Sequence, residues 1–115
     1  MARNNFQGYV IDSHKGLVRK FVGHVPEIYE ALNCTTFTIV TIDINGQKWD
    51  LYLDDEGMYN HPHHGIKLRH GDGMFFGNGV LLGYNPEDGS TRSCKIGPHA
   101  VNEAFTFWYD LHESI

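Results

Sequence analysis

Four histidines within a ten-residue segment are the most conspicuous candidates for chemistry in this chain of 115 residues. They are His61, His63, His64 and His70. Imidazole is a common ligand for zinc, copper and nickel, so the segment could hold a divalent transition metal and serve a small metal-dependent hydrolase. It lacks both the HExxH pattern and paired cysteines, whereas a catalytic metal needs ligands on rigid elements. The pattern therefore favours a solvated polar loop, with metal coordination, ligand contact and proton transfer as alternatives.

A second candidate site combines basic residues with a glycine-rich segment, and it would take a small anionic ligand such as a nucleotide. Its residues are Arg19, Lys20, Gly77, Asn78, Gly79 and Arg92. Arginine and lysine suit an anion, and exposed backbone N–H groups of the glycine-rich segment could donate hydrogen bonds to it. The glycine spacing does not match the dinucleotide-binding fingerprint, because one residue too many separates the second and third glycines. A β-bulge is the alternative interpretation of these glycines.

Other catalytic patterns are absent or weak. Asp54, Asp55 and Glu56 are adjacent, so their side chains alternate in direction and do not converge as an acid–base pair would. The chain has no Gly-x-Ser-x-Gly elbow, which removes support for a serine hydrolase. Cys34 and Cys94 lie far apart, which indicates two free thiols in a reducing cytoplasm. We therefore expect no enzymatic activity and no bound cofactor. A divalent transition metal at the four histidines is the alternative.

The composition of the chain argues against two classes of partner, nucleic acids and membranes. Nine Lys and Arg residues against fourteen Asp and Glu residues give a formal net charge of −5, which argues against general nucleic-acid binding. The apolar runs are too short to span a bilayer, and no hydrophobic signal region follows the first residues. We expect one domain over residues 1–115, located in the cytoplasm and without a membrane partner.

The clearest local signal for structure is Asn45-Gly46, the dipeptide best suited to a two-residue hairpin turn. It separates two β-like runs at 35–44 and 47–54. The turn fixes the register, so that Ile44 faces Gln47 and Val40 faces Leu51. The apolar face of this predicted hairpin collects Val40, Ile42, Trp49, Leu51 and Leu53.

The remaining elements follow from shorter signals. A hairpin is expected from 7–12 and 16–22, and a two-turn helix from 26–32 that stops at Asn33 in the left-handed region. Residues 58–73 are interpreted as a loop. A third hairpin is expected from a strand at 74–83, bulged at 77–79, and a returning strand at 90–96.

The last element is predicted as a helix from 97 to about 112. Its apolar arc would cover roughly 200° of the helix surface, wider than the stripe of an ordinary surface helix. Such an arc either packs into a concave sheet or also meets a second chain. In the second case Phe107, Trp108 and Tyr109 would form the interface of a homo-oligomer.

The order of these elements resembles a family of small phage and prophage proteins that is catalogued only as a domain of unknown function. The resemblance runs from about Tyr9 to Ile96 and rests on the helix 28–32, the segments 51–57 and 76–83, the Pro62 loop and the turn 87–89. His63 and His64 stand where the family usually has an asparagine. The resemblance implies a phage accessory protein that binds a host component, and it carries over no catalytic residue.

Together these patterns predict an α+β fold: an antiparallel β-sheet of hairpins, one short helix, and a C-terminal amphipathic helix packed on the sheet. The expected function is non-catalytic binding that inhibits or sequesters a host component, for example in antiviral defence. The partner would be a host protein surface or a small anionic ligand of the nucleotide type. The metal-dependent hydrolase and a structural or assembly module are the alternatives.

Overall fold

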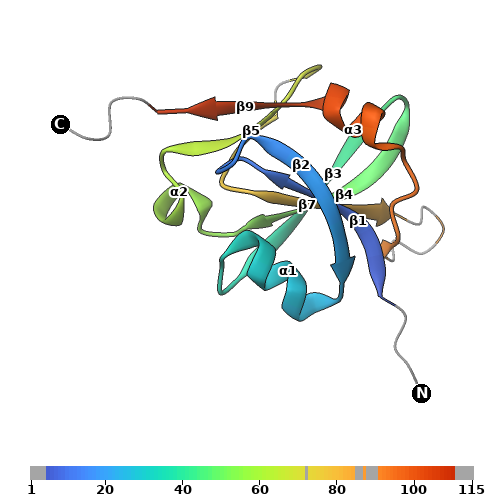
Figure 1. Ribbon diagram of the computed structural model, residues 1–115, viewed down its shortest axis with the longest axis horizontal. Helices are drawn as coiled ribbons and strands as arrows, with labels where there is room; N and C mark the ends of the chain where they lie inside the picture. Colours follow the sequence, from blue (N-terminus) through green and yellow to red (C-terminus); the bar gives the residue numbers. More distant parts are fainter. Residues whose placement is uncertain (1–4, 72, 85–86, 88–90, 111–115) are drawn as a thin grey trace.

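The computed structural model describes residues 5–71, 73–84, 87 and 91–110, and it has the expected α+β class (Figure 1). Two antiparallel sheets carry the fold. The larger sheet has the order β2-β1-β7-β4-β3, with β8 also paired to β7. Its strands are β1 (Phe6–Asp12), β2 (Leu17–Gly23), β3 (Phe37–Ile44), β4 (Gln47–Asp54), β7 (Gly79–Tyr84) and β8 (Thr91–Arg92). The smaller sheet, in the order β6-β5-β9, contains β5 (His64–Leu68), β6 (Met74–Phe76) and β9 (Phe105–Tyr109).

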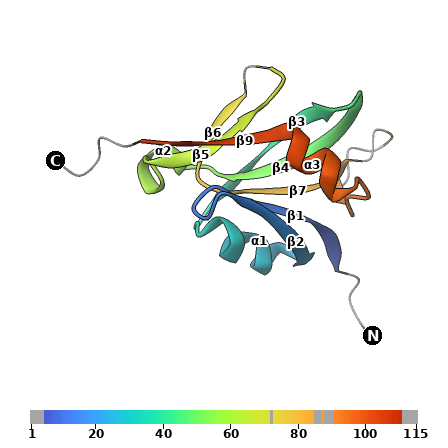
Figure 2. The same ribbon diagram turned by 45° about the horizontal axis from the view of Figure 1, so that its top comes forward.

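Three short helices complete the fold: α1 (Val25–Leu32), α2 (Gly57–Asn60) and α3 (Pro98–Ala104). Figure 2 shows α1 on one side of the larger sheet and the smaller sheet with α3 on the other. Ile28 and Leu32 of α1 pack in one buried cluster, with Val80 of β7 among its members. Ile66 of β5 belongs to a second cluster with Leu51 of β4. The larger sheet is therefore covered on both faces. No helix in the described part of the chain is long and apolar enough to cross a membrane.

The predicted hairpin around Asn45-Gly46 is confirmed. β3 and β4 pair from Ile44↔Gln47 to Phe37↔Asp54, in the expected register. Asn45 and Gly46 have φ angles of 54° and 84°, as the two-residue turn requires. The predicted apolar face of this hairpin packs in the second cluster. The turn type and the alternation of apolar and polar residues along the strands therefore predict correctly which face of the hairpin is buried.

The first hairpin and the helix after it are also confirmed. β1 pairs with β2 from Phe6↔Gly23 to Asp12↔Leu17. Pro26 lies in the first turn of α1, where its missing N–H is not needed, and Asn33 ends the helix with a φ of 52°. The chain then enters β3 a few residues later. The helix packs on one face of the larger sheet through Ile28 and Leu32.

Two predictions between residues 58 and 83 are wrong. The predicted loop 58–73 instead contains part of α2 and all of β5. The predicted single bulged strand is two strands in different sheets, because the chain leaves β6 and crosses to β7 through 77–78. Gly77 has a φ of +82°, and a Cβ at Gly79 would lie 2.8 Å from the Leu51 side chain. The glycines thus serve a change of sheet rather than a bulge.

The C-terminal helix exists but is shorter than predicted. α3 packs on the core through Val101 and ends at Ala104, after which 105–109 form β9, antiparallel to β5. Phenylalanine, tryptophan, tyrosine and threonine all favour strands, and β5 offers an edge to pair with. Residue 90 of the returning strand predicted at 90–96 lies outside the described residues. Over 91–96 the strand is limited to β8, in which Arg92 pairs with Gly83.

Candidate functional site

A pocket of about 320 Å³ lies where the β1–β2 turn, the end of α1 and the start of β5 meet. Polar and ionisable side chains dominate its wall. We call it the histidine pocket, and it is lined by Asp12, His14, Lys15, Arg19, Glu30, Ala31, Leu32, Asn33, His61, His64 and Asn78. The His14 and His61 rings both lie close to the His64 ring, with centroids 5.4 and 5.8 Å from it.

Asn78 holds the walls of the histidine pocket together. Its Oδ1 accepts hydrogen bonds from the backbone N–H of Ser13 at 2.9 Å and of His14 at 3.4 Å. Its Nδ2 donates to the carbonyl of Ala31, at the end of α1, at 3.3 Å. Because the oxygen accepts from N–H groups and the nitrogen donates to a carbonyl, the orientation of the amide is fixed. One side chain from the β6–β7 crossover therefore joins the hairpin turn to the helix.

Ser13 connects this network to His64. The Ser13 Oγ lies 2.6 Å from the His64 Nδ1 and 3.1 Å from the Asn78 Oδ1. The hydroxyl has one proton, so it donates either to the amide oxygen or to the imidazole. In the first case His64 carries its proton on Nδ1, and in the second the neutral ring carries it on Nε2. Ser13 is fully buried, so its hydroxyl orients the His64 ring and does not line the pocket.

The carboxyl group of the buried residue Asp54 lies beside His61. Asp54 Oδ2 is 3.0 Å from the His61 Nε2, in a geometry that does not make a hydrogen bond. Asp54 also accepts hydrogen bonds from the Glu56 backbone N–H at 2.8 Å and from the Asn60 Nδ2 at 2.9 Å. These two hydrogen bonds fix the position of the buried Asp54 carboxyl group beside His61.

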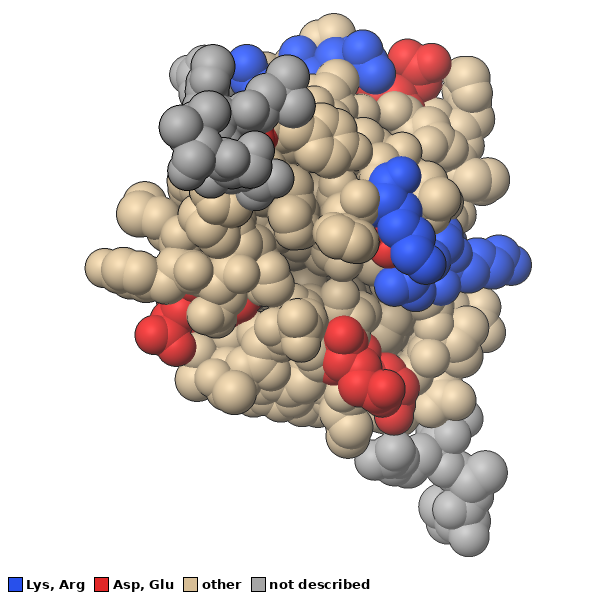
Figure 3. All heavy atoms as spheres, turned by 60° about the vertical axis from the view of Figure 1, so that its left-hand side comes forward, with Lys and Arg blue, Asp and Glu red and all other residues tan. Residues whose placement is uncertain are grey.

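The charged residues at the β1–β2 turn are partly paired. Arg19 Nε lies 3.4 Å from the buried Asp12 Oδ2, and the Lys15 backbone N–H donates to Asp12 Oδ1 at 3.0 Å. Glu30 lies on the opposite wall. Figure 3 shows basic side chains gathered on one face of the molecule, with acidic side chains close beside them. The Arg19 Nε contact leaves the terminal nitrogens of its guanidinium group as further donors on the pocket wall.

The structure separates the four histidines that the sequence groups together. His61 and His64 line the histidine pocket, whereas His63 lies 3.5 Å from Asp110 near the end of β9. His70 follows the other end of β5, in a hollow that also contains Glu103. Across the described ranges, no three His, Cys, Asp or Glu side chains are arranged to hold a metal ion.

The anion-site candidates are divided in the same way. Arg19 and Asn78 line the histidine pocket, but Lys20 faces a neighbouring groove. The backbone N–H of Gly77 donates to the His64 carbonyl at 2.8 Å, so it is already used within the protein. Gly79 pairs within the larger sheet. Arg92 lies in β8, and its side chain is outside what the structure describes.

The proposed interface residues lie on β9 rather than on a helix. The indole N–H of Trp108 donates to the Phe75 carbonyl at 3.0 Å, and the ring meets Phe76 edge-on. Phe107 packs against the core, whereas Tyr109 is 51% exposed. Trp108 thus has a role within the smaller sheet, which leaves Tyr109 as the most exposed of the three.

Sequence reasoning missed the contribution of Asp12, Ser13 and His14. The sequence pattern predicts only the end of a strand and part of a turn at these three positions. A histidine next to a serine at a hairpin turn is a weak signal by itself. What gives these residues a role is the packing of the turn against β5 and Asn78, and that packing joins segments far apart in the sequence.

The thiols are expected to react slowly. Burial, and secondarily the negative charge of Asp54, raise the pKa of Cys34 to about 11, and burial also raises the pKa of Cys94. A raised pKa keeps a thiol protonated at neutral pH. Alkylation of Cys34 by iodoacetamide at neutral pH should therefore be about a hundredfold slower than in the urea-unfolded chain. Peptide mapping by mass spectrometry measures both rates, and equal rates would show that Cys34 is not protected.

Comparison with known proteins does not identify the chain. No protein-family model matches the sequence, and no significant match was found among curated proteins or among solved structures.

Proposed function

We propose that this protein is a non-catalytic binding protein that sequesters a small anionic ligand, of the phosphate or nucleotide class, in the histidine pocket. The observation that carries the proposal is the convergence of Arg19, Lys15 and the imidazoles of His14, His61 and His64 on one concave surface. Asp12 and Glu30 lie on the same surface, and Asp12 is paired with the Nε of Arg19. Arginine and lysine supply charge, and imidazole N–H groups supply further donors. The volume of about 320 Å³ lies at the small end of ligand sites, which suits a phosphate with one attached group.

Two features support ligand binding over catalysis. The Ser13 hydroxyl lies 2.6 Å from the His64 Nδ1, but its complete burial keeps it away from a ligand in the pocket. Asp54 lies 3.0 Å from His61 but does not line the histidine pocket. Neither Ser13 nor Asp54 is therefore placed to react with a ligand in the histidine pocket.

Pre-organisation adds to this argument. Asn78 fixes the hairpin turn relative to α1, and Ser13 fixes the orientation of His64, before any ligand arrives. A ligand that enters such a pocket loses less free energy to ordering of the protein, so a few charged hydrogen bonds suffice for useful affinity.

The biological setting that we propose is the one implied by the resemblance to small phage and prophage proteins. In a bacterial host, such a phage accessory protein would protect the phage by binding a nucleotide-type signal of antiviral defence. This setting rests on the resemblance and on the chemistry of the pocket, and a direct measurement of anion binding does not depend on it.

Calorimetric titration with pyrophosphate, with adenosine monophosphate and with uncharged adenosine tests the binding proposal. We expect saturable binding of at least one anion and none of adenosine. Arg19→Ala should weaken anion binding about tenfold or more, because it removes a charged donor from the pocket. Arg69→Ala is the matched control, since the Arg69 Nε donates to the Glu103 carbonyl away from the pocket.

Two results would contradict the proposal: no anion bound at millimolar concentration, or equal affinity in the Arg19→Ala and Arg69→Ala variants. Native mass spectrometry of untagged protein gives an independent measurement. A reproducible extra mass of a few hundred daltons would identify the class of ligand retained from the cell.

A further inference from the structure

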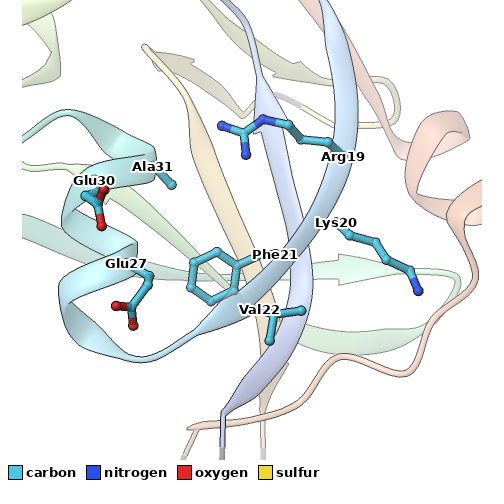
Figure 4. Close-up of a pocket in the computed structure, with 7 residues that line it drawn as sticks. All are labelled: Arg19, Lys20, Phe21, Val22, Glu27, Glu30 and Ala31. Carbon is cyan, nitrogen blue, oxygen red and sulfur yellow. The ribbon is translucent and has the colours of Figure 1, made fainter.

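A second concave surface lies beside the histidine pocket, between β2 and α1. It has a volume of about 350 Å³ and is lined by Arg19, Lys20, Phe21, Val22, Glu27, Glu30 and Ala31. We call it the β2–α1 groove. Figure 4 shows Arg19 and Phe21 pointing from β2 toward α1, and Lys20 pointing away from the helix. Four consecutive residues of one strand line the groove, so it follows the backbone of β2 and not just one of its faces.

β2 is the edge strand of the larger sheet. It pairs with β1 on one side, and the described residues place no strand on its other side. Alternate N–H and C=O groups along an edge strand point outward and offer a ladder of hydrogen bonds to an added strand. β2 is seven residues long, and it has apolar side chains that are exposed: Leu17 is 42% exposed and Val22 is 55% exposed. These properties suit the addition of an extended segment.

The charges of the β2–α1 groove argue against a second copy of this chain as the added strand. The sequence of β2, LVRKFVG, contains two cations and no acid. Antiparallel pairing of two copies of β2 would bring Arg19 and Lys20 of each copy together with no acidic residue on either strand. Like charges placed across strands are destabilising, so these charges favour an occupant with a different sequence.

The same charges indicate what the occupant carries. On the side that faces α1, Arg19 supplies a basic side chain from β2, while Glu27 and Glu30 supply acidic side chains from the helix. Lys20 supplies a second basic side chain on the other face of β2. Glu27 Oε1 already accepts a hydrogen bond from the His24 backbone N–H at 2.6 Å, so Glu30 is the acid better placed to meet a partner. An added strand would present alternate side chains to α1 and to the opposite face, where Lys20 lies.

We propose that the β2–α1 groove docks an extended segment of another protein, which adds a strand to the edge of β2. The segment carries a basic side chain facing Glu30 and an acidic side chain beside Lys20, with an apolar residue against Val22. Backbone hydrogen bonds supply most of the affinity, and the alternating charges determine the register and the choice of partner.

Selection from a library of random peptides of about twelve residues tests this proposal, and it does not require the partner to be identified first. The wild-type protein is the target. We expect the enriched peptides to share an alternation of acidic and basic residues around an apolar position. Hydrogen exchange measured by NMR should then show added protection at alternate β2 amides when an enriched peptide is present, and a peptide with methylated backbone amides should not bind.

Lys20→Glu separates this proposal from anion binding. Lys20 lines the β2–α1 groove but not the histidine pocket, so the variant should bind an enriched peptide about tenfold more weakly and bind the anion as the wild type does. Lys48→Glu on the β3–β4 hairpin, far from the groove in sequence and exposed, is the charge-matched control. The proposal is overturned by a selection that enriches no peptide, by peptides that leave β2 amides unprotected, or by full binding of the methylated peptide.

Discussion

Replacing Asn78 with alanine should lower the free energy of unfolding by about 3 kcal/mol. The variant loses the acceptor for the backbone N–H of Ser13 and the donor to the Ala31 carbonyl. Ser13 is fully buried, so its N–H would be left without a partner and without access to water. The cost of an unsatisfied buried donor adds to that of the lost hydrogen bonds, which explains why one amide has so large an expected effect.

Urea unfolding followed by circular dichroism measures this change. Asn102→Ala is the matched control, because Asn102 makes an exposed hydrogen bond to the Pro98 carbonyl, and its loss should cost less than about 1 kcal/mol. Asn78→Asp keeps an acceptor for the Ser13 N–H and should fall between wild type and Asn78→Ala. If Asn78→Ala and Asn102→Ala unfold at the same urea concentration, Asn78 does not hold the hairpin turn to α1.

Gly65→Ala should be destabilising to a similar degree, by about 3 kcal/mol, for a different reason. Gly65 lies in the middle of the smaller sheet, paired with Phe76 on one side and Trp108 on the other. A Cβ there would overlap the Phe75 carbonyl oxygen and lie 2.7 Å from the ring of Trp108. The backbone oxygen cannot move without breaking the β5–β6 pairing, and the indole is held by its hydrogen bond to the same carbonyl.

Thermal unfolding distinguishes this steric effect from the general effect of replacing glycine. Gly97→Ala is the control, because a Cβ at Gly97 would have no heavy atom within 4 Å and the residue has a φ of −73°. We expect Gly97→Ala to unfold within a degree or two of the wild type and Gly65→Ala to unfold well below it. A Gly65→Ala protein as stable as Gly97→Ala would mean that β6 and β9 do not pack around β5 as described.

Local signals predicted the parts of the fold whose structure is determined locally. Asn45-Gly46 is sufficient to set a turn type, and the turn type sets the register of β3 and β4. Pro26 and Asn33 mark the start and end of α1 because each satisfies a local backbone requirement. These elements needed no information from the rest of the chain.

The smaller sheet could not be predicted in this way. β5 is a short strand in a segment rich in histidine and glycine, and its partners β6 and β9 contribute the neighbours that make it a strand. The aromatic run 105–109 suits either a helix face or a strand, and the edge of β5 decides between them. Only the long-range pairing resolves such an ambiguity.

The histidine pocket was partly predictable. Arg19, Asn78, His61 and His64 were all candidates, but they belonged to two separate hypotheses, one for an anion and one for a metal. The packing of the β1–β2 turn against β5 joins them in one pocket and leaves out His63 and His70. Residue type thus indicated which side chains could act, while tertiary structure determined which of them act together.

The central place of β7 sets the order in which the larger sheet can assemble. The β1–β2 and β3–β4 hairpins are each closed by a short turn, so each can form within microseconds independently of the other. Val80 of β7 pairs with both Val10 and Tyr52, and this strand is what joins the two hairpins. Its insertion closes long loops, so we expect it to limit the folding rate. Until β7 leaves the ribosome, the nascent chain contains two hairpins whose edge strands are unpaired. We expect the nascent chain to be most prone to aggregation at this stage.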